Sequence, residues 1–225
     1  MGLKQLRQSF LFNGLVALLL FVPAGTLAWP EAWIFLGIFA GCGLATGVWL
    51  SRVDPDLLAE RMKSPLRAGQ RRRDRVIIAV MMGAMAGWLV FMALDARRFA
   101  WSDVPFWAQV LGAAMIVVAF VGWAAVLRAN RFAVTTVRLQ EERGQTVISS
   151  GPYAVVRHPM YAFALFLLVG TPLLLGSFWG LLGLAFFVPL LALRALGEEA
   201  LLMDGLAGYR DYAARVRYRL LPGLW

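Results

Sequence analysis

The chain has 225 residues, of which 60% are hydrophobic and only 16% are charged. A soluble domain usually contains about 45–50% apolar and about 25% charged residues, so this composition excludes an ordinary soluble domain and predicts a polytopic membrane protein. The formal net charge is +9, but basic residues beside apolar segments usually report membrane topology or contact with anionic lipid. We therefore expect the lipid bilayer, and no nucleic acid, as a partner.

Six apolar runs follow one another along the chain, and a helix needs about 20 residues to cross a bilayer. The runs cover residues 9–28, 31–50, 76–94, 105–127, 160–176 and 178–196. The last two are short for full spans and predict a hairpin over residues 160–196, and a five-span count stays open if one of the early runs is only interfacial. The sequence thus predicts an all-α membrane protein with five to six transmembrane helices, followed by an amphipathic tail helix in residues 197–225.

The basic residues predict the orientation of these spans. With six spans and the N-terminus inside, the outer loops keep only Arg97 and Arg98 of the 22 Lys and Arg residues. Because Lys and Arg prefer the cytoplasmic side, we expect the basic loop 51–75 and both termini to be cytoplasmic, and we take a bacterial inner membrane as the location. A single cysteine, Cys42, excludes an intrachain disulfide and a cysteine metal site, and no metal site is predicted.

The spans contain almost no ionisable side chain, which disfavours a channel or transporter because an ion or proton would have no relay to follow. They do contain glycines four residues apart, which predict close packing of helices. These pairs are Gly37/Gly41, Gly43/Gly47 and Gly83/Gly87. The unusual polar residues gather in the cytoplasmic segments, so an enzyme or binding site at the inner surface fits better.

The stretch "GPYAVVRHPMY", residues 151–161, contains the only histidine of the chain, His158. Pro159 holds the residue before it in extended geometry and suits the first turn of the next helix. The N-terminus of such a helix attracts a carboxylate or phosphate, and Arg157 can bind the same anion in bidentate fashion. An interfacial anchor would explain Arg, His and Tyr at a membrane boundary equally well, so this stretch alone leaves both interpretations open.

The last segment adds a second group of polar residues. Glu198 and Glu199 follow the final apolar run, one helical turn after Arg194, where an intrahelical ion pair would be possible. Tyr209 and Tyr212 continue a helix that could lie along the membrane surface. Taken alone, these features indicate no more than a solvated helix end and an interfacial helix.

Together the two segments resemble the isoprenylcysteine carboxyl methyltransferase family. The resemblance rests on a Gly-Pro-Tyr turn, an Arg-His-Pro-x-Tyr motif, a Glu pair with Leu three residues on, spaced tyrosines and a terminal Arg and Pro; here these are Gly151, Pro152, Tyr153, Arg157, His158, Pro159, Tyr161, Glu198, Glu199, Leu202, Tyr209, Tyr212, Arg219 and Pro222. "DPDLLAERMK", residues 54–63, also resembles a cytoplasmic-loop feature of many relatives, whereas Phe163 stands where the family commonly has Gly. The resemblance covers residues 128–225 well and residues 1–127 only in hydropathy, which predicts a four-span N-terminal region and a C-terminal core within one integrated domain.

The resemblance implies an integral membrane enzyme that uses S-adenosylmethionine. Its cofactor-binding residues would be Gly151, Tyr153, Arg157, His158, Pro159, Tyr161, Glu198, Glu199, Tyr209 and Tyr212. Arg157 and the helix start suit the carboxylate of the cofactor, a glutamate suits its ammonium or ribose, and tyrosines suit its adenine or sulfonium. Arg194 and Glu198 are the catalytic candidates, with Arg194 orienting an acceptor carboxylate and positioning supplying most of the rate acceleration.

The acceptor implied by the resemblance is amphipathic or prenylated, with the carboxyl group of an isoprenylcysteine-type molecule as the first expectation. Methylation of a phospholipid amine or a small thiol is the alternative within the same class. An NADPH-dependent reductase of the sterol-reductase type is a second class, although the short tail disfavours it, and a non-catalytic scaffold is a third. The sequence contains no signal for oligomeric state.

Overall fold

The computed structural model describes residues 3–63 and 72–225, without the side chains of residues 3–5 and 73, so residues 64–71 of the basic loop 51–75 lie outside the description. The described residues form helices and no strand, in agreement with the predicted all-α class. The long helices are α1 (Leu3–Ala24), α2 (Pro30–Val53), α4 (Arg72–Ala93), α5 (Phe106–Ala129), α6 (Pro159–Leu175) and α7 (Gly183–Gly205). Short elements are α3 (Pro55–Arg61), a π-helical turn η1 (Leu94–Arg98), the 3-10 turns η2 (Glu141–Arg143), η3 (Gly151–Ala154) and η4 (Trp179–Leu182), and α8 (Tyr209–Arg215).

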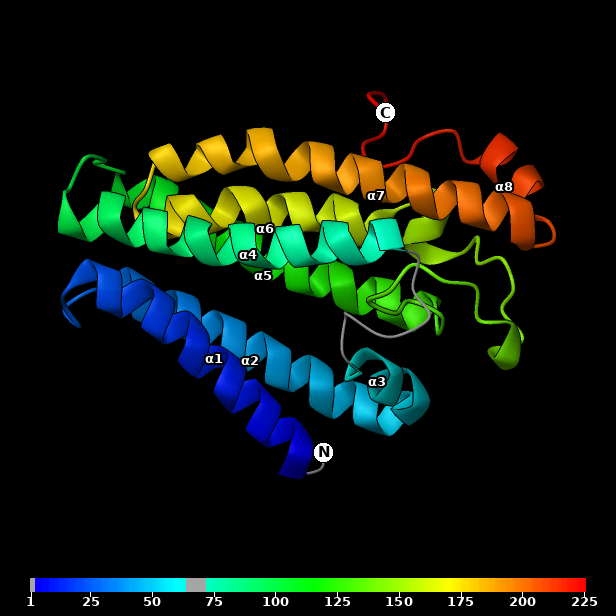
Figure 1. The fold of residues 1–225 in the computed structure, drawn as a ribbon, viewed down its shortest axis with the longest axis horizontal. Helices are drawn as coiled ribbons and strands as arrows, with labels where there is room; N and C mark the ends of the chain where they lie inside the picture. Colours follow the sequence, from blue (N-terminus) through cyan, green and yellow to red (C-terminus); the bar gives the residue numbers. More distant parts are fainter. Residues whose placement is uncertain (1–2, 64–71) are drawn as a thin grey trace.

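The six long helices form an antiparallel bundle (Figure 1). Within the described residues, five helical stretches are long and apolar enough to cross a membrane, namely Leu6–Ala24, Pro30–Val53, Asp74–Arg98, Phe106–Ala129 and Trp179–Gly205. The sixth apolar helix, α6, has 17 residues and is shorter than a full span. The predicted count of five to six transmembrane helices therefore holds, with α6 as the short member.

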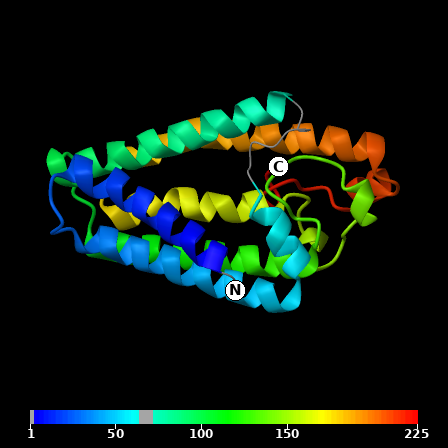
Figure 2. The ribbon, with the colours of Figure 1, turned by 60° about the horizontal axis from the view of Figure 1, so that its bottom comes forward.

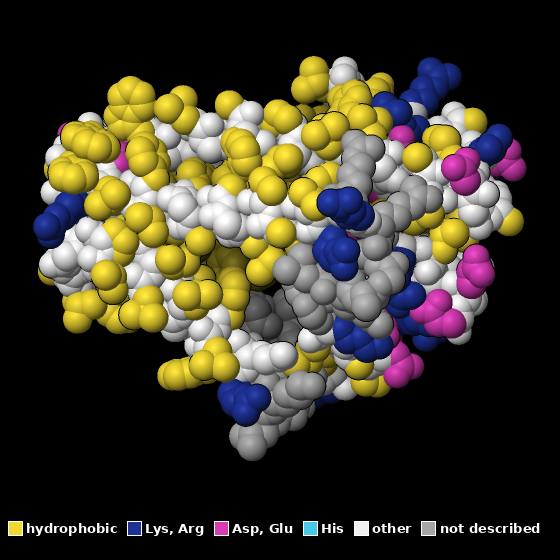
Figure 3. Space-filling model, in the orientation of Figure 1, with side chains coloured by type: hydrophobic (Ala, Val, Ile, Leu, Met, Phe, Trp, Pro, Cys, Tyr) yellow, Lys and Arg dark blue, Asp and Glu magenta, His cyan; other side chains and the backbone are white. Residues whose placement is uncertain are grey.

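The surface of the bundle has the polarity of a membrane protein. Large apolar side chains such as Phe10, Val22, Phe106 and Val121 are exposed along the helices. Figure 3 shows hydrophobic side chains over the length of the bundle, with Lys, Arg, Asp and Glu gathered mainly toward the end that carries α3 and α8. Buried residues such as Met92 hold the helices together inside.

The closest helix contact joins α5 to α6. A Cβ atom added at Gly112 would lie 2.6 Å from the backbone oxygen of Gly170, so only glycine lets the two backbones approach here. Toward the end of the same pair that leads to the 130–148 loop, Gly122 makes room for the ring of Phe163, the residue that departs from the family pattern. The four-residue glycine pairs of α2 and α4 face no neighbouring atom within 4 Å in the described structure, so the close packing predicted for them is wrong.

At the end of the bundle opposite α3 and α8, a buried carboxylate joins several elements through hydrogen bonds. Asp95, in η1, is fully buried and accepts hydrogen bonds from the hydroxyl groups of Ser102 at 2.7 Å and Ser177 at 2.5 Å. Ser177 in turn accepts a bond from the N–H of Gly180 at 2.9 Å. These bonds join the end of α4 to the loop before α5 and to the turn that leads into α7.

The C-terminal part differs from the prediction in one respect that matters for the site. The last long helix continues to Gly205, beyond the predicted end of the hairpin at residue 196. Glu198 and Glu199 consequently lie within α7. The tail helix is confined to α8, and the residues after it fold back along the bundle (Figure 1). The division of the chain at residue 127 stays a prediction. Residue 127 lies in α5, and α5 packs side by side with α6, which belongs to the predicted C-terminal core.

Candidate functional site

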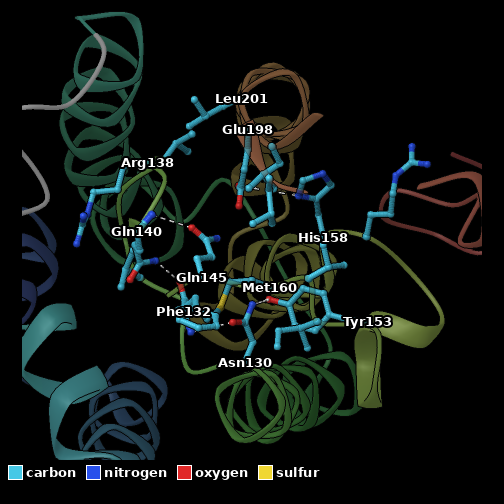
Figure 4. Close-up of a pocket in the computed structure, with 18 of the residues that line it drawn as sticks. Asn130, Phe132, Arg138, Gln140, Gln145, Tyr153, His158, Met160, Glu198 and Leu201 are labelled. Carbon is cyan, nitrogen blue, oxygen red and sulfur yellow. Dashed lines mark hydrogen bonds and ion pairs between the residues drawn. The ribbon is translucent and has the colours of Figure 1, made fainter. Parts of the chain in front are cut away.

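A cavity of about 300 Å³ lies at the end of the bundle that carries α3 and α8. Its walls come from residues 130–148, the start of α6, the last turns of α7, and α8. In Figure 4, Glu198 of α7 and His158 face each other from opposite elements, and Gln140 and Gln145 lie together on another side. Small-molecule sites usually have about 300–1,000 Å³, so this cavity is at the small end of that range.

The start of α6 is held by the returning tail. The backbone N–H groups of Arg157 and His158 donate to the carbonyl oxygens of Tyr218 and Arg219, both at 2.9 Å. Pro159 is the first residue of α6, as its fixed backbone angle predicts. The N–H groups of the next turn are largely used, because those of residues 161 and 162 both donate to the carbonyl oxygen of His158. The helix start therefore offers an anion fewer free donors than the sequence indicates.

Glu199 is the centre of a buried ion-pair cluster. It is 3% exposed and accepts hydrogen bonds from Arg157 Nε at 2.6 Å and Arg219 Nε at 2.9 Å, with His158 Nε2 at 3.2 Å. Arg157 also donates to the carbonyl oxygens of Ala213 and Val216, at 3.0 and 3.1 Å. A buried charge is tolerated when it is paired and hydrogen-bonded in this way. The cluster ties α7, the start of α6 and the tail into one unit.

Glu198, the neighbour of Glu199, faces the cavity itself. Its Oε2 accepts a hydrogen bond from the hydroxyl of Tyr161 at 2.8 Å and lies 3.9 Å from His158 Nδ1. The rings of His158 and Tyr161 are stacked, 5.5 Å apart and 9° from parallel. Successive residues of an α-helix point about 100° apart, so Glu199 lies in the buried cluster while Glu198 lines the cavity.

Arg194 lies between this cavity and a second one. Its Nε pairs with Asp74 Oδ1 at 3.2 Å, it donates to the carbonyl oxygen of Thr135, and its guanidinium lies 5.7 Å from the centre of the Tyr161 ring. The second cavity is a cleft of about 330 Å³, lined by residues of α4 and α7 that are mainly apolar; they include Ile77, Leu193, Leu196, Gly197 and Ala200. Arg194 and Val137 line both cavities.

Tyr209 and Tyr212, which are buried, and Tyr153, which is partly buried, supply aromatic surface. The hydroxyl of Tyr153 accepts a hydrogen bond from the side chain of Asn130 at 2.8 Å, and the hydroxyl of Tyr212 donates to the carbonyl oxygen of Tyr153 at 2.8 Å. Burial raises the pKa of Tyr153 and of Tyr209 above that of a free phenol, and it raises the pKa of Tyr212 to about 12. All three phenols are therefore neutral at physiological pH. The hydroxyl of Tyr209 is buried and has no hydrogen-bond partner among the described residues.

The structure brings most of the predicted site residues to one cavity. Its wall contains Tyr153, Arg157, His158, Tyr161, Arg194, Glu198, Tyr209 and Tyr212. Gly151, Pro159 and Glu199 lie outside the wall. Gly151 has φ +59° at the start of η3, a conformation that glycine adopts without strain, and Pro159 begins α6. The position of these three indicates that they shape the site. Direct cofactor contact stays a prediction for the ten cofactor-binding candidates, and so do the catalytic roles of Arg194 and Glu198.

Residues 130–148 form a wall that sequence reasoning missed. Gln140 is 1% exposed, and its side-chain amide donates to the carbonyl oxygen of Phe132 at 2.7 Å. Its backbone N–H donates to the side-chain oxygen of Gln145 at 2.8 Å. Arg61 of α3 also lines the cavity, although it comes from the N-terminal half. The available signal was a long polar stretch without helical periodicity between two spans, which is typical of a functional loop.

Fold and site together define an integral membrane protein with a polar cavity at one end of its helical bundle. Residues 107–206 match the model of a family described as phospholipid methyltransferase. These residues contain all but the first residue of α5, all of α6 and all of α7, and most of the wall of the cavity; Arg61, Tyr209 and Tyr212 of that wall lie outside them. The match covers somewhat less than half of the chain and agrees with the resemblance to integral membrane methyltransferases noted in the sequence. The comparison with curated proteins gives no match.

Proposed function

We propose that this membrane protein is a methyltransferase that transfers the methyl group of S-adenosylmethionine to an amphipathic or lipid-like acceptor. The observation that carries the proposal is the position of Glu198 and Arg194 on one face of α7. Glu198 faces a polar cavity, and Arg194, one turn earlier, separates that cavity from an apolar cleft. A polar donor and an apolar acceptor could therefore meet between these two side chains.

The residues of the polar cavity fit the groups of S-adenosylmethionine. Glu198 supplies a carboxylate for its ammonium, and the aromatic rings of Tyr153, Tyr209 and Tyr212 supply surface for its adenine or sulfonium. The buried hydroxyl of Tyr209 lacks a partner among the described residues, and a buried polar atom of this kind is stabilised by a ligand that bonds it. When bound, the cofactor supplies an electrophilic methyl group on a sulfonium.

The apolar cleft supports a lipid-like acceptor. Leu193 and Leu196 line it and are more than a third exposed on the side of α7. In a bilayer this side would meet lipid tails, so an apolar chain could lie in the cleft while its polar group reaches Arg194. Positioning of this polar group against the donor is the contribution we assign to the chain.

Two acceptor groups are compatible with the site, and each has one observation in its favour. A carboxylate, as in an isoprenylcysteine-type molecule, suits Arg194, which uses Nε and one Nη2 N–H of its five donors in the bonds described above. A phospholipid amine suits the family description and the ion pair that already occupies Arg194 with Asp74. An ammonium group must also lose a proton before its nitrogen lone pair can attack the methyl group, and Glu198 is the cavity carboxylate that could accept that proton.

The small volume of the polar cavity disfavours the reductase alternative. A dinucleotide such as NADPH is considerably larger than S-adenosylmethionine, and the cavity of about 300 Å³ lies at the small end of ligand sites. We further propose that the end with the cavity faces the cytoplasm of a bacterial inner membrane, with both termini on that side, because the water-soluble donor is made there.

Calorimetric titration of the detergent-solubilised protein with S-adenosylhomocysteine and with NADPH tests the proposal. We expect binding of S-adenosylhomocysteine alone, weakened by Glu198→Gln. Labelled methyl transfer to phosphatidylethanolamine and to an S-farnesylcysteine derivative then identifies the acceptor group. Binding of NADPH alone would move the protein to the reductases, and binding of neither would favour a non-catalytic role.

A further inference from the structure

Four arginines line the polar cavity, and three of them are paired with carboxylates. Arg157 pairs with Glu199 at 2.6 Å, and Arg194 pairs with Asp74 at 3.2 Å. Arg138 lies 3.3 Å from Glu60 and 2.5 Å from Glu142. The fourth arginine is Arg61, and it has no carboxylate partner among the described residues. Its Nη1 donates to a neutral group, the carbonyl oxygen of Ala133, at 2.7 Å.

The position of Arg61 is built into the fold. The helix α3 that it ends is capped by Asp54, whose Oδ1 accepts the N–H of Leu57 at 2.9 Å. Leu57 is fully buried in a small apolar cluster with Leu50 and Leu127. The views agree in placing α3 against the loop after α5 (Figure 2). A side chain anchored in this way loses little further freedom when it binds a ligand.

A guanidinium in such a wall is costly unless an anion neutralises it. Burial lowers the pKa of Arg61, and the nearby phenol of Tyr153 acts in the opposite direction. Arginine nevertheless stays charged at physiological pH. Its planar fork of N–H donors matches the two oxygens of a carboxylate or phosphate. Arg157, which the sequence favours for this role, already donates to Glu199 and to two carbonyl oxygens.

We propose that Arg61 binds an oxyanion of the ligand in the polar cavity. The assignment rests on the proposed function, which supplies two sources for the same chemistry. One source is the carboxylate of the methionine portion of S-adenosylmethionine, and the other is the phosphate of a phospholipid acceptor. In either case α3, which lies outside the matched residues 107–206, contributes directly to the ligand site.

Arg61→Gln in the full-length, detergent-solubilised protein tests this site by titration calorimetry. The probes are S-adenosylhomocysteine, 5′-methylthioadenosine, which lacks the amino-acid portion, and glycerophosphoethanolamine, which carries the phosphate. Removal of a charge-assisted hydrogen bond should weaken the relevant probe by about tenfold to a hundredfold. Arg131→Gln is the matched control, because Arg131 reaches the same α3 through Asp54 at 4.0 Å but does not line the cavity.

A selective loss of S-adenosylhomocysteine affinity, with 5′-methylthioadenosine unchanged, identifies the carboxylate. A selective loss of glycerophosphoethanolamine affinity identifies the phosphate. Equal losses for all probes, equal effects of both substitutions, or no effect of Arg61→Gln overturn the proposal. If the wild-type protein binds neither nucleoside, the proposed function fails, and the glycerophosphoethanolamine titration alone decides on Arg61.

Discussion

Glu198 and Glu199 are adjacent, but replacing each by Gln should affect different properties of the protein. Glu199→Gln removes the one carboxylate shared by Arg157, Arg219 and His158, all within 3.2 Å of it. Glu198→Gln changes a side chain that is 33% exposed and whose described partners are the hydroxyl of Tyr161 and a histidine nitrogen at 3.9 Å. The first substitution should affect folding, and the second should affect ligand binding.

The burial of each side chain sets the expected magnitudes. Removing one partner of a buried ion pair costs about 3–5 kcal/mol, and the side chain of Glu199 is only 4% exposed. For a chain of this size that corresponds to a decrease of roughly 6–20 °C in Tm, at about 2–4 °C per kcal/mol. For Glu198→Gln we expect the free energy of unfolding to fall by about 1 kcal/mol or less, because the hydroxyl of Tyr161 can still donate to the amide oxygen of Gln.

Thermal unfolding in detergent and titration with S-adenosylhomocysteine measure the two effects separately. Asp204→Asn on the same helix is the control, because the Asp204–Arg210 pair spans 3.9 Å with both side chains 76% exposed, and it should shift stability by about 1 kcal/mol at most. Wild-type stability of Glu199→Gln, or a larger loss of stability in Glu198→Gln, would refute the assignment of separate roles.

Four further substitutions, the last of them a control, have outcomes that can be measured directly. Asp74→Asn should change the KM for the acceptor and leave the affinity for S-adenosylhomocysteine within about twofold, because Asp74 pairs with Arg194 at the apolar cleft. Steady-state kinetics measure the first quantity and calorimetry the second, which distinguishes this outcome from a general loss of folded protein. The folded-state pKa of about 12 for Tyr212 exceeds its ordinary value of 10.0, so the stabilisation from its protonated form is complete below pH 10 and is lost as the pH rises toward 12; Tyr212→Phe should reduce this alkaline loss in unfolding measurements. Gly112→Ala should lower stability by about 1–3 kcal/mol through overpacking against α6, whereas Gly83→Ala, which meets no atom within 4 Å, should leave the Tm at or above the wild-type value.

The sequence predicts local features of this protein well where one residue restricts the backbone. Hydropathy locates the helices, and the His158-Pro159 pair predicts the start of α6 at the correct residue. The different surroundings of Glu198 and Glu199 also follow from helix geometry, although composition alone did not separate them. The extension of α7 to Gly205 was not predicted, because two glutamates after an apolar run are typical of a helix end at the membrane surface.

The remaining features depend on contacts between segments far apart in the sequence. Arg61 reaches the cavity because Leu57 packs against Leu127, a contact that no local pattern reveals. The glycine pairs of α2 and α4 have the spacing of packed helices, yet the glycines that allow backbone contact are Gly112 and Gly170, one on each partner helix. Spacing within one helix cannot identify the face that its neighbour covers.

The returning tail links the stability of the protein to the geometry of its site. The tail supplies carbonyl oxygens to the backbone of Arg157 and His158, and Arg219 supplies charge to Glu199. Glu199 and Glu198 are consecutive on α7, so a movement of the buried cluster would also move the carboxylate that faces the cavity. The ion-pair cluster centred on Glu199, which lies outside the cavity wall, thus fixes the direction of Glu198, and we expect the polar side of the cavity to be rigid because this support is buried. On the apolar side, the described ion pair is that of Arg194 with Asp74, a single pair where the polar side has a cluster around Glu199. We therefore expect the donor side of the site to be preorganised and the acceptor side to adjust when a lipid-like molecule enters.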